Sequence, residues 1–453
     1  MRLRFLLLGA SLSMACGDSG TGGGGGEAQG GEAATGGSGG IPAQGGQPST
    51  GGNASTGGEG GTYVPDAIPD IDDEPPAPCQ AAIDESWPPQ FLYDICGDKR
   101  KPSYVDRELS CPSVDTSATI ALTGGGEVTY LPSSAPVEVD STALAGIVPD
   151  DVQITVILIR RVDGVPHYRY ISNGNHADAY QPWSTSKFIA AANAASTLRY
   201  ESASEVGLTA SVDGYPLGDL VTSLVSYDYD PFSSNALGRY FHNIGGRSKA
   251  NGLIHDLWLG RPSSETFGGN YGEAAPGLDY TFEEPEGPTI TISPDGSTGP
   301  SNHLSSFTTA EAMKRLVLHR EEPSQSLPDL QWQDAEVMLY GAEGSDKGPF
   351  GGLSSDPAIY VQSGHDIDYI EARSHGRYRI FSKLGNGTDG QMANVAYACF
   401  PVLDPNEQPV PGWGREFVIS AHLATGGATW KERDRILAKH YRAVIERIVD
   451  GRL

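Results

Sequence analysis

The sequence predicts a mixed α/β (α+β) domain that contains both antiparallel strands and amphipathic helices. Residues 154–160 (ITVILIR) and 165–171 (VPHYRYI) are apolar, β-branched runs, and the Asp163-Gly164 dipeptide between them is typical of a tight hairpin turn. The C-terminal stretch carries apolar side chains at helical spacing, namely Leu437, Tyr441, Val444, Ile445 and Ile448. We therefore expect a hairpin near the start of the domain and a helix at its end.

The stretches between this hairpin and the C-terminal helix also show a clear preference for helix or strand. A helix is expected to begin at Ser184, ahead of the run FIAAANAASTL, and another after the polar loop that ends near Ser233. Residues 308–319 (TTAEAMKRLVLH) are expected to be helical, whereas RYRIFSKLG and MANVAYACF are expected to be strands. Two short strands, in ATIALTG and EVTYLP, are expected before the hairpin.

Ser184 and Lys187, in the tetrapeptide STSK, are the first candidate catalytic pair. A spacing of three residues at a helix start places the hydroxyl and the amine on one face. A serine hydroxyl is a weak nucleophile at neutral pH, and Lys187 can serve as its base if burial and nearby cations lower the lysine pKa. The motif alone is weak, because an ordinary helix start with a Ser cap has the same pattern.

Two further motifs follow along the chain. SSN at residues 233–235 stands at a loop-to-helix junction, and KLG at residues 383–385 ends a strand-like run. S-x-x-K, S-x-N and K-x-G, in that order and in those contexts, resemble the penicillin-recognising serine enzymes, which include class A β-lactamases and penicillin-binding proteins. The resemblance covers about residues 150–453, from the hairpin to the C-terminal helix.

The resemblance implies a β-lactamase-like fold, in which an antiparallel sheet is flanked by helices and joined to a mainly helical lobe. Ser184 would attack the carbonyl of a β-lactam or of a D-Ala-D-Ala peptide and become acylated, with Lys187 as its base. Ser233 would relay a proton to the leaving nitrogen, while Asn235 would hold Lys187 and the amide side chain of the substrate. Lys383 would attract the substrate carboxylate and favour the neutral form of Lys187.

Backbone amides complete the implied site. The N–H groups of Ser184 and Asn386 would form the oxyanion hole, since fixed donors need no reorganisation during the reaction. Gly385 and Asn386 would bind substrate together with Asn235. We expect no cofactor and no metal, because no histidine lies in an H-E-x-x-H motif and the densest polar group lacks metal-ligand spacing: His365, Asp366, Asp368 and His375.

Two departures from the family pattern bear on turnover. The family usually has Thr or Ser after the lysine of K-x-G, where this sequence has Leu384. Class A β-lactamases hydrolyse the acyl-enzyme with a Glu in an E-P-x-L-N loop, which this sequence lacks. The corresponding region, residues 261–306, is Gly/Pro-rich, and Glu273 is its best positional candidate for the base, with an exposed loop carboxylate as the alternative. The candidates considered are Glu265, Glu273, Glu283, Glu284 and Glu286.

The expected activity is hydrolysis of a small-molecule β-lactam through an acyl-enzyme at Ser184. Without a deacylating base, the chain would instead act as a D,D-peptidase on peptidoglycan peptides. A third alternative is a binding or scaffold lipoprotein of the same fold with little turnover, although such a protein has no need of Ser184 and Lys187 together.

The N-terminus predicts export and a lipid anchor. Residues 1–16 combine arginines, a short apolar run and small residues before Cys16, similar to a bacterial lipoprotein signal in which the cysteine is lipidated. We expect a Gly-rich disordered linker over residues 17–75, an extension over residues 76–150 that is either a small cap or an addition to the main sheet, and the hydrolase domain over residues 151–453.

We expect a monomeric protein that faces the periplasm or the cell surface and contacts the membrane only through its lipid anchor. Its formal net charge of −26 argues against nucleic acid and anionic membrane surfaces as partners.

Four cysteines remain beyond Cys16. In an exported chain an even number suggests two disulfides, for which three pairings exist. We expect Cys79 with Cys96 and Cys111 with Cys399, and buried free thiols are the alternative.

Two motif matches are rejected on context. Residues 385–390 match the dinucleotide fingerprint G-x-G-x-x-G, but a strand-like run follows where that fingerprint requires a helix. Residues 36–40 match G-x-S-x-G but lie in the Gly-rich linker, without the strand and helix of a nucleophile elbow.

Overall fold

The computed structural model describes residues 107, 111–226, 230–356, 359–362, 367–424 and 429–453. The chain divides into two units, Met1–Gly61 and Thr62–Leu453, and the described residues all belong to the second. The predictions for the signal, for Cys16, for the linker and for the Cys79–Cys96 pair therefore lie outside the described residues.

A seven-stranded sheet forms the centre of the described part of the second unit. Its strands follow the order β13 (Arg379–Asn386), β14 (Met392–Phe400), β15 (Arg415–Leu423), β5 (Val152–Val162), β6 (Val165–Ser172) and β3 (Leu131–Pro132), with β4 (Val139–Asp140) also beside β6. Neighbours are antiparallel, except that β4 runs parallel to β6. β13 therefore lies at one edge of the sheet.

The predicted hairpin is confirmed as β5 and β6. Val162 and Val165 face each other at its closed end, and Asp163 and Gly164 between them have φ angles of 52° and 80°. Positive φ at both central positions matches the twist of the flanking strands, and Asp and Gly tolerate that conformation. β5 is buried on both faces, which explains why its apolar residues form a continuous run.

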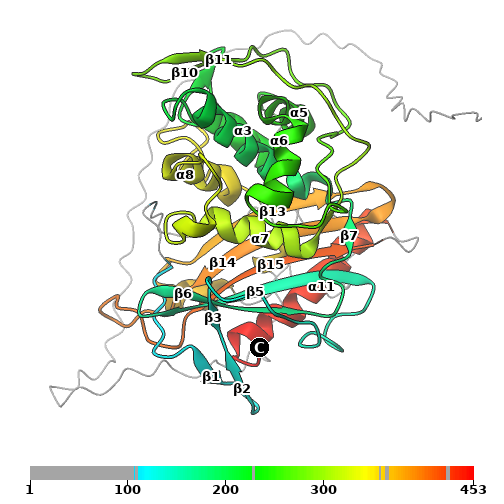
Figure 1. Cartoon of the computed structure of the whole chain (residues 1–453). Helices are drawn as coiled ribbons and strands as arrows, with labels where there is room; N and C mark the ends of the chain where they lie inside the picture. Colours follow the sequence, from blue (N-terminus) through cyan, green and yellow to red (C-terminus); the bar gives the residue numbers. More distant parts are fainter. Residues whose placement is uncertain (1–106, 108–110, 227–229, 357–358, 363–366, 425–428) are drawn as a thin grey trace, which may run out of the picture. The chain divides into compact units, whose positions relative to one another are not determined.

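Helices cover both faces of the sheet (Figure 1). α7 (Ser306–Val317) packs against β5, β14 and β15 on the side of the helical lobe, and α11 (Trp430–Val449) packs against β14 and β15 on the other side. The lobe contains α3 (Lys187–Glu201), α4 (Leu217–Ser226), α5 (Ser234–Gly245), α6 (Arg247–Gly252) and α8 (Trp332–Tyr340). Along the chain, α9 (Ile359–Gln362) and α10 (Ile367–Ser374) follow the lobe and precede β13, and both contribute residues to the hydrophobic cluster on the α11 side. The predicted α/β architecture is thus confirmed.

Small strand pairs complete the fold. They are β1 (Thr119–Ala121) with β2 (Glu127–Thr129), β7 (Ala179–Tyr180) with β12 (Leu304–Ser305), and a four-stranded group of β8 (Ser211–Val212), β9 (Tyr215–Pro216), β10 (Thr281–Glu283) and β11 (Thr289–Thr291).

The sheet separates two hydrophobic clusters. Successive side chains of a strand point to opposite faces. Ile157 and Ile159 of β5 accordingly pack with the helical lobe and α7, whereas Val156 and Leu158 pack with α11. Because a hydrophobic core covers each face, the sheet, including its edge strand β13, is a rigid support for the side chains of the lobe that contact it.

The described part of the N-terminal extension adds to the main sheet. β3 and β4 both pair with β6, so these residues extend the main sheet and do not form a separate cap. β1 and β2 pair only with each other. Cys111 forms the predicted disulfide with Cys399 of β14. The extension is therefore tied to the core sheet by hydrogen bonds and by a covalent bond.

The predicted C-terminal helix is confirmed as α11. Thr429 and Glu432 form a reciprocal capping box at its N-terminus. The residues expected on its buried face are all at most 3% exposed: Leu437, Tyr441, Val444, Ile445 and Ile448.

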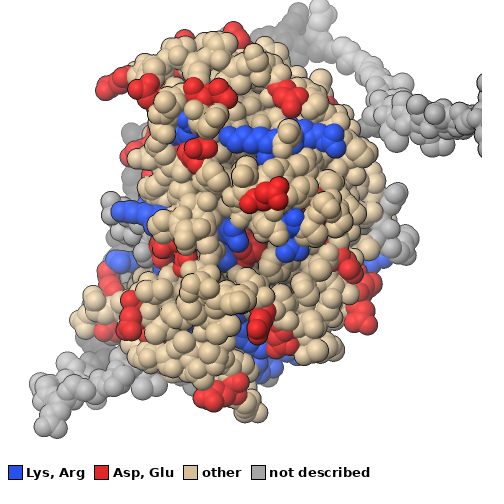
Figure 2. Space-filling view, in the orientation of Figure 1, with Lys and Arg blue, Asp and Glu red and all other residues tan. Residues whose placement is uncertain are grey.

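Charges of both signs are spread over the surface. In Figure 2, Asp and Glu side chains lie over both the lobe and the sheet region, and a row of Lys and Arg side chains crosses the lobe. Within the described residues, none of the helices has the length and the apolar character that crossing a bilayer requires.

Candidate active site

Ser184 lies in a 3₁₀ turn, Trp183–Ser186, directly ahead of α3. In a 3₁₀ turn residues three apart eclipse each other, so Ser184 and Lys187 lie on one side, as the S-x-x-K spacing predicts. The α-helix itself begins at Lys187, three residues later than expected. Ser184 is partly exposed, and its hydroxyl forms no hydrogen bond with the residues that the structure describes.

Trp183 holds this turn in an unusual conformation. Its φ angle is 51°, in the left-handed region that is costly for a bulky residue. Its indole Nε1 donates to Gln391 Oε1 at 2.9 Å, and the ring fills the space beside Gly387, where a Cβ would lie 2.3 Å from it. The connection between β13 and β14 thereby fixes the residue that precedes Ser184.

Lys187 is a buried amine with uncharged hydrogen-bond partners. Its side chain is fully buried, and Nζ donates to Ser234 Oγ at 2.9 Å and to Asn235 Oδ1 at 2.7 Å. Burial lowers the pKa of Lys187 well below its usual range, the charge of Lys383 lowers it further, and Glu273 opposes the shift. An amine in this state can be neutral near pH 7 and accept a proton.

The S-x-N motif opens α5, as expected. Ser233 caps the helix, since its Oγ accepts the backbone N–H of Ala236 at 3.1 Å. The same hydroxyl donates to the Glu273 carboxylate, and Asn235 Nδ2 donates to Glu273 Oε1 at 3.1 Å. Glu273 therefore lies beside the motif, and the hydroxyl bonded to Lys187 belongs to Ser234, the middle residue of the motif, instead of Ser233.

The other glutamates of residues 261–306 have different surroundings. Glu265 is buried and accepts hydrogen bonds from Ser305 and Thr308, which hold the start of α7. Glu284 accepts the Gly207 backbone N–H at 2.8 Å. Glu283 and Glu286 are exposed in and after β10. Among these candidates, Glu273 is the one whose described hydrogen bonds reach the motif residues.

Lys383 projects from β13 into the interior of the site. It is fully buried, forms an ion pair with Asp356 at 3.7 Å, and donates to the carbonyls of Val225 at 3.2 Å and Leu384 at 3.0 Å. Burial lowers the pKa of Lys383 to about 8, although Asp356 opposes the shift. Its positive charge is therefore partly balanced by a carboxylate that the motif did not predict.

Leu384 and Gly385 have separate structural roles. Leu384 is fully buried in the cluster that packs with α11, on the sheet face opposite Lys383. Gly385 lets β13 approach the 3₁₀ turn, because a Cβ there would lie 2.5 Å from Thr185 Oγ1 and 2.8 Å from the Pro182 carbonyl oxygen. Asn386 ends β13 and is exposed. The K-x-G pattern thus marks the place where the edge strand meets the turn that carries Ser184.

Sequence reasoning missed several residues of the site. Tyr271 lies over Lys187, whose Nζ is 5.4 Å from the ring centroid, and its hydroxyl is 3.4 Å from Ser186 Oγ. Asn302 Nδ2 donates to the same Ser186 oxygen at 3.1 Å. Burial raises the pKa of the Tyr271 phenol, so it stays protonated. No local pattern marks these residues, because each reaches the site from a loop far along the chain.

The structure also bears on the rejected signals. Residues 385–390 run from the end of β13 through a 3₁₀ turn into β14, so a strand follows them, as predicted. Of the polar group that lacks metal-ligand spacing, His365 and Asp366 lie outside the described residues, Asp368 lies in α10, and His375 follows that helix. Among the residues that the structure describes, no group of His, Cys, Asp and Glu is arranged to hold a metal ion.

No protein-family model matches the sequence, and no curated protein matches it either. Solved structures of class A β-lactamases do show a likeness. A mutant of the last common ancestor of Gram-negative bacteria class A β-lactamase has 15% identity and a TM-score of 0.37, covering 65% of this chain and 92% of that chain. The last common ancestor itself has 14% identity, a TM-score of 0.37 and coverages of 65% and 93%. An ancestral class A β-lactamase has 15% identity, a TM-score of 0.36 and coverages of 65% and 94%.

Proposed function

We propose that this chain is a serine hydrolase of the β-lactamase and penicillin-binding protein superfamily, and that it hydrolyses β-lactams through an acyl-enzyme at Ser184. The observation that carries the proposal is the state of Lys187. A fully buried lysine, one turn from a partly exposed serine, donates to a hydroxyl and an amide of the S-x-N motif and has a strongly lowered pKa.

In the acylation step, Lys187 Nζ accepts the proton of Ser184 Oγ while that oxygen attacks the lactam carbonyl. The negative charge on the carbonyl oxygen would be met by the backbone N–H groups of Ser184 and Asn386, which lie on the 3₁₀ turn and on the edge strand. The C–N bond then breaks, and the leaving nitrogen takes a proton from Lys187 through a hydroxyl of the S-x-N motif. Ser233 is the relay expected from the resemblance, and Ser234 is the hydroxyl bonded to Lys187.

Substrate orientation is assigned to the two other polar motif residues. Asn235 bridges Lys187 and Glu273, which fixes its amide for contact with a substrate amide. Lys383 supplies positive potential for a substrate carboxylate, reduced by the Asp356 charge beside it. Gly385 contributes by the close approach that it permits.

Deacylation is assigned to Glu273. Its carboxylate is held by Ser233 and Asn235, on the loop that also carries Tyr271 across Lys187. From this place it can take a proton from a water molecule that attacks the ester carbonyl of acylated Ser184.

One observation favours D,D-peptidase activity as the second candidate. The Glu273 carboxylate already accepts hydrogen bonds from two motif side chains, and its side chain is exposed. A carboxylate engaged in this way is less available to activate a water molecule, so the acyl-enzyme would persist with penicillins and turn over with peptide substrates. The proposal places either activity outside the cytoplasm, on a domain anchored through Cys16.

The test is a reaction of the full chain with benzylpenicillin, followed by absorbance of the lactam and by intact mass. Rapid loss of absorbance supports a lactamase. A long-lived adduct together with cleavage of a D-Ala-D-Ala peptide supports the peptidase. If neither substrate is consumed and no adduct forms, the proposed function is wrong.

A further inference from the structure

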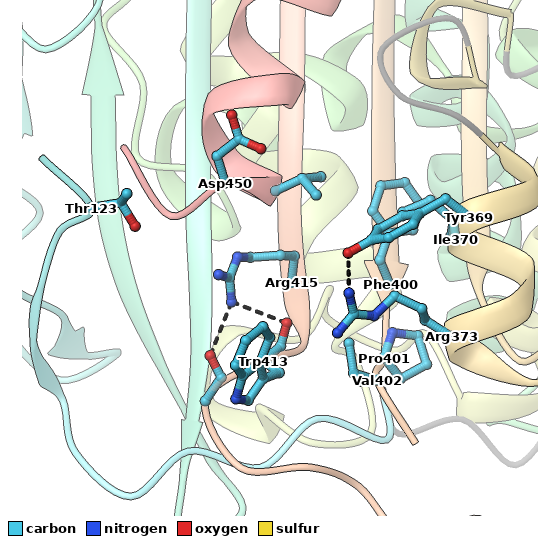
Figure 3. A pocket seen from close by; sticks show the side chains of 12 residues that line it. Thr123, Tyr369, Ile370, Arg373, Phe400, Pro401, Val402, Trp413, Arg415 and Asp450 are labelled. Atoms are coloured by element: carbon cyan, nitrogen blue, oxygen red, sulfur yellow. Dashed lines mark hydrogen bonds between the residues drawn. The ribbon is translucent and has the colours of Figure 1, made fainter. Parts of the chain in front are cut away.

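A cavity of about 410 Å³ lies on the α11 side of the sheet (Figure 3). Its walls come from α10, from the C-terminal end of α11 and from the residues that join β14 to β15. Ile370 and Phe400, which line it, belong to the hydrophobic cluster against α11, whereas α3 and its Lys187 lie on the other face of the sheet. The cavity is therefore separate from the site at Ser184.

The lining combines an apolar floor with cationic groups. Ile370, Phe400, Val402 and Val449 supply apolar surface. Arg373 from α10 and Arg415 from β15 bring their guanidinium groups toward the cavity from opposite sides, as Figure 3 shows. A volume of this size is typical of small-molecule sites that pair apolar walls with a few polar groups.

Aromatic rings hold Arg373 in place. The guanidinium carbon lies 4.9 Å from the ring centroid of Tyr369 and 5.4 Å from that of Trp413, and Nη1 also donates to the Tyr369 hydroxyl. Trp413 is 38% exposed, so part of its ring is accessible to a ligand. The cavity therefore offers a flat aromatic surface beside a fixed cation.

Backbone carbonyls hold Arg415. Its Nε donates to Ile448 at 2.8 Å, at the end of α11, and its Nη1 donates to Gly412 at 3.0 Å. The one acidic residue of the lining, Asp450, is paired with Arg452. Two of the residues that line the cavity are therefore cationic, in a chain whose net charge is −26.

We propose that this cavity binds an organic anion with a flat apolar body, an aromatic carboxylate being the matching class. The guanidinium fork fits the two oxygens of a carboxylate, and Trp413 and the apolar floor fit an aromatic ring. The ion pair and the ring stacking each contribute part of the binding energy. Separate substitutions can therefore remove each contribution.

The experiment is calorimetric titration of the full chain with naphthalene-2-carboxylate and with the uncharged naphthalene-2-carboxamide. We expect the carboxylate to bind at least about tenfold more tightly, since a hydrogen bond to a charged group is worth that much. Arg373→Gln should remove this preference, and Trp413→Ala should weaken both ligands. Arg377→Gln is the matched control, because Arg377 carries the same charge nearby but pairs with Glu407 on the surface.

Several results would overturn the proposal. They are equal affinity for the two ligands, no binding up to about millimolar concentration, or equal effects of Arg373→Gln and Arg377→Gln. A carboxylate affinity that survives Arg373→Gln would place the ligand elsewhere, including the Lys383 site, and would also contradict it.

Discussion

Two buried lysines on the lobe side of the sheet have opposite surroundings. Lys187 bonds to a hydroxyl and an amide, whereas Lys314 of α7 lies 2.8 Å from Glu311 and also donates to Tyr170 at 2.7 Å. Burial lowers the pKa of both. At Lys314 the next largest influence is Glu311, which opposes the shift, ahead of Arg315, which adds to it; at Lys187 it is Lys383, which adds to the shift, ahead of Glu273, which opposes it.

The carboxylate beside Lys314 confirms the difference. Burial alone would raise the pKa of Glu311, but Lys314 and Arg315 lower it to about 2, so the acid stays ionised and the pair is held as ions. Lys314 thus shows that this protein can bury a lysine as part of a charged pair. The described hydrogen bonds of Lys187 go instead to a hydroxyl and an amide of the S-x-N motif, which suits the proton acceptor proposed above.

The largest effect is expected from Lys187→Met. It removes the base and should slow acylation by benzylpenicillin by about 10³-fold. The free energy of unfolding should stay level or rise, because the substitution removes the cost of burying an amine. Stopped-flow acylation rates and urea unfolding measure the two quantities, and a normal rate would break the contrast with Lys314.

Lys314→Met should do the reverse. It leaves the Glu311 carboxylate buried with Arg315 as its remaining ionic partner, so the free energy of unfolding should fall by about 3 kcal/mol. Acylation per folded molecule should be unchanged. Adding Glu311→Gln should recover much of the stability, and a loss of acylation in folded Lys314→Met would mean that the two lysines are not functionally distinct.

Glu273→Gln tests the loop opposite Lys187. If Glu273 activates water, deacylation should slow by about 100-fold while acylation persists, so that the acyl-enzyme accumulates. A pre-steady-state burst with a reduced steady-state rate is the expected signature. Glu286→Gln, an exposed change on the same stretch, is the matched control, and an unaltered steady state in Glu273→Gln would remove this residue from the mechanism.

Asp356→Asn should have the smallest effect, on pH dependence. The pKa of Lys383 is lowered to about 8 by burial, and Asp356 raises it. As the pH rises through about 8, Lys383 loses its charge, so KM for a carboxylate-bearing substrate should increase. Removing Asp356 lowers the pKa of Lys383 further and should move this increase to lower pH. A KM profile that stays in place would show that Lys383 does not sense Asp356.

Local patterns in the sequence predict much of the fold. The hairpin, the strands β13 and β14, α7 and α11 each carry a periodicity or a turn dipeptide that depends on neighbouring residues alone. The expected export of the chain and its even number of cysteines predict disulfides but leave three pairings, of which the expected Cys111–Cys399 bond is confirmed. The role of the N-terminal extension was left open, because strands as short as β3 and β4 form only when β6 is present to pair with them.

The candidate site likewise contains residues that local patterns identify and residues that they do not. The motif residues were predicted at their positions, since spacing and local context identify them. Asp356, Tyr271 and Asn302 were not, because their contacts with Lys383, Lys187 and Ser186 join segments that are remote in sequence. These side chains lie beside the charged groups of the candidate site, which is why substrate and turnover are harder to predict from the sequence than a candidate nucleophile.

The most direct measurement of the central claim is the position of a penicilloyl adduct. The full chain is reacted with benzylpenicillin, digested, and the peptide that spans Ser184 to Lys187 is fragmented in a mass spectrometer. The account predicts an adduct on Ser184 that is absent in Ser184→Ala and still formed in Ser186→Ala. An adduct on Ser186 or Ser233, or an undiminished adduct in Ser184→Ala, would contradict it.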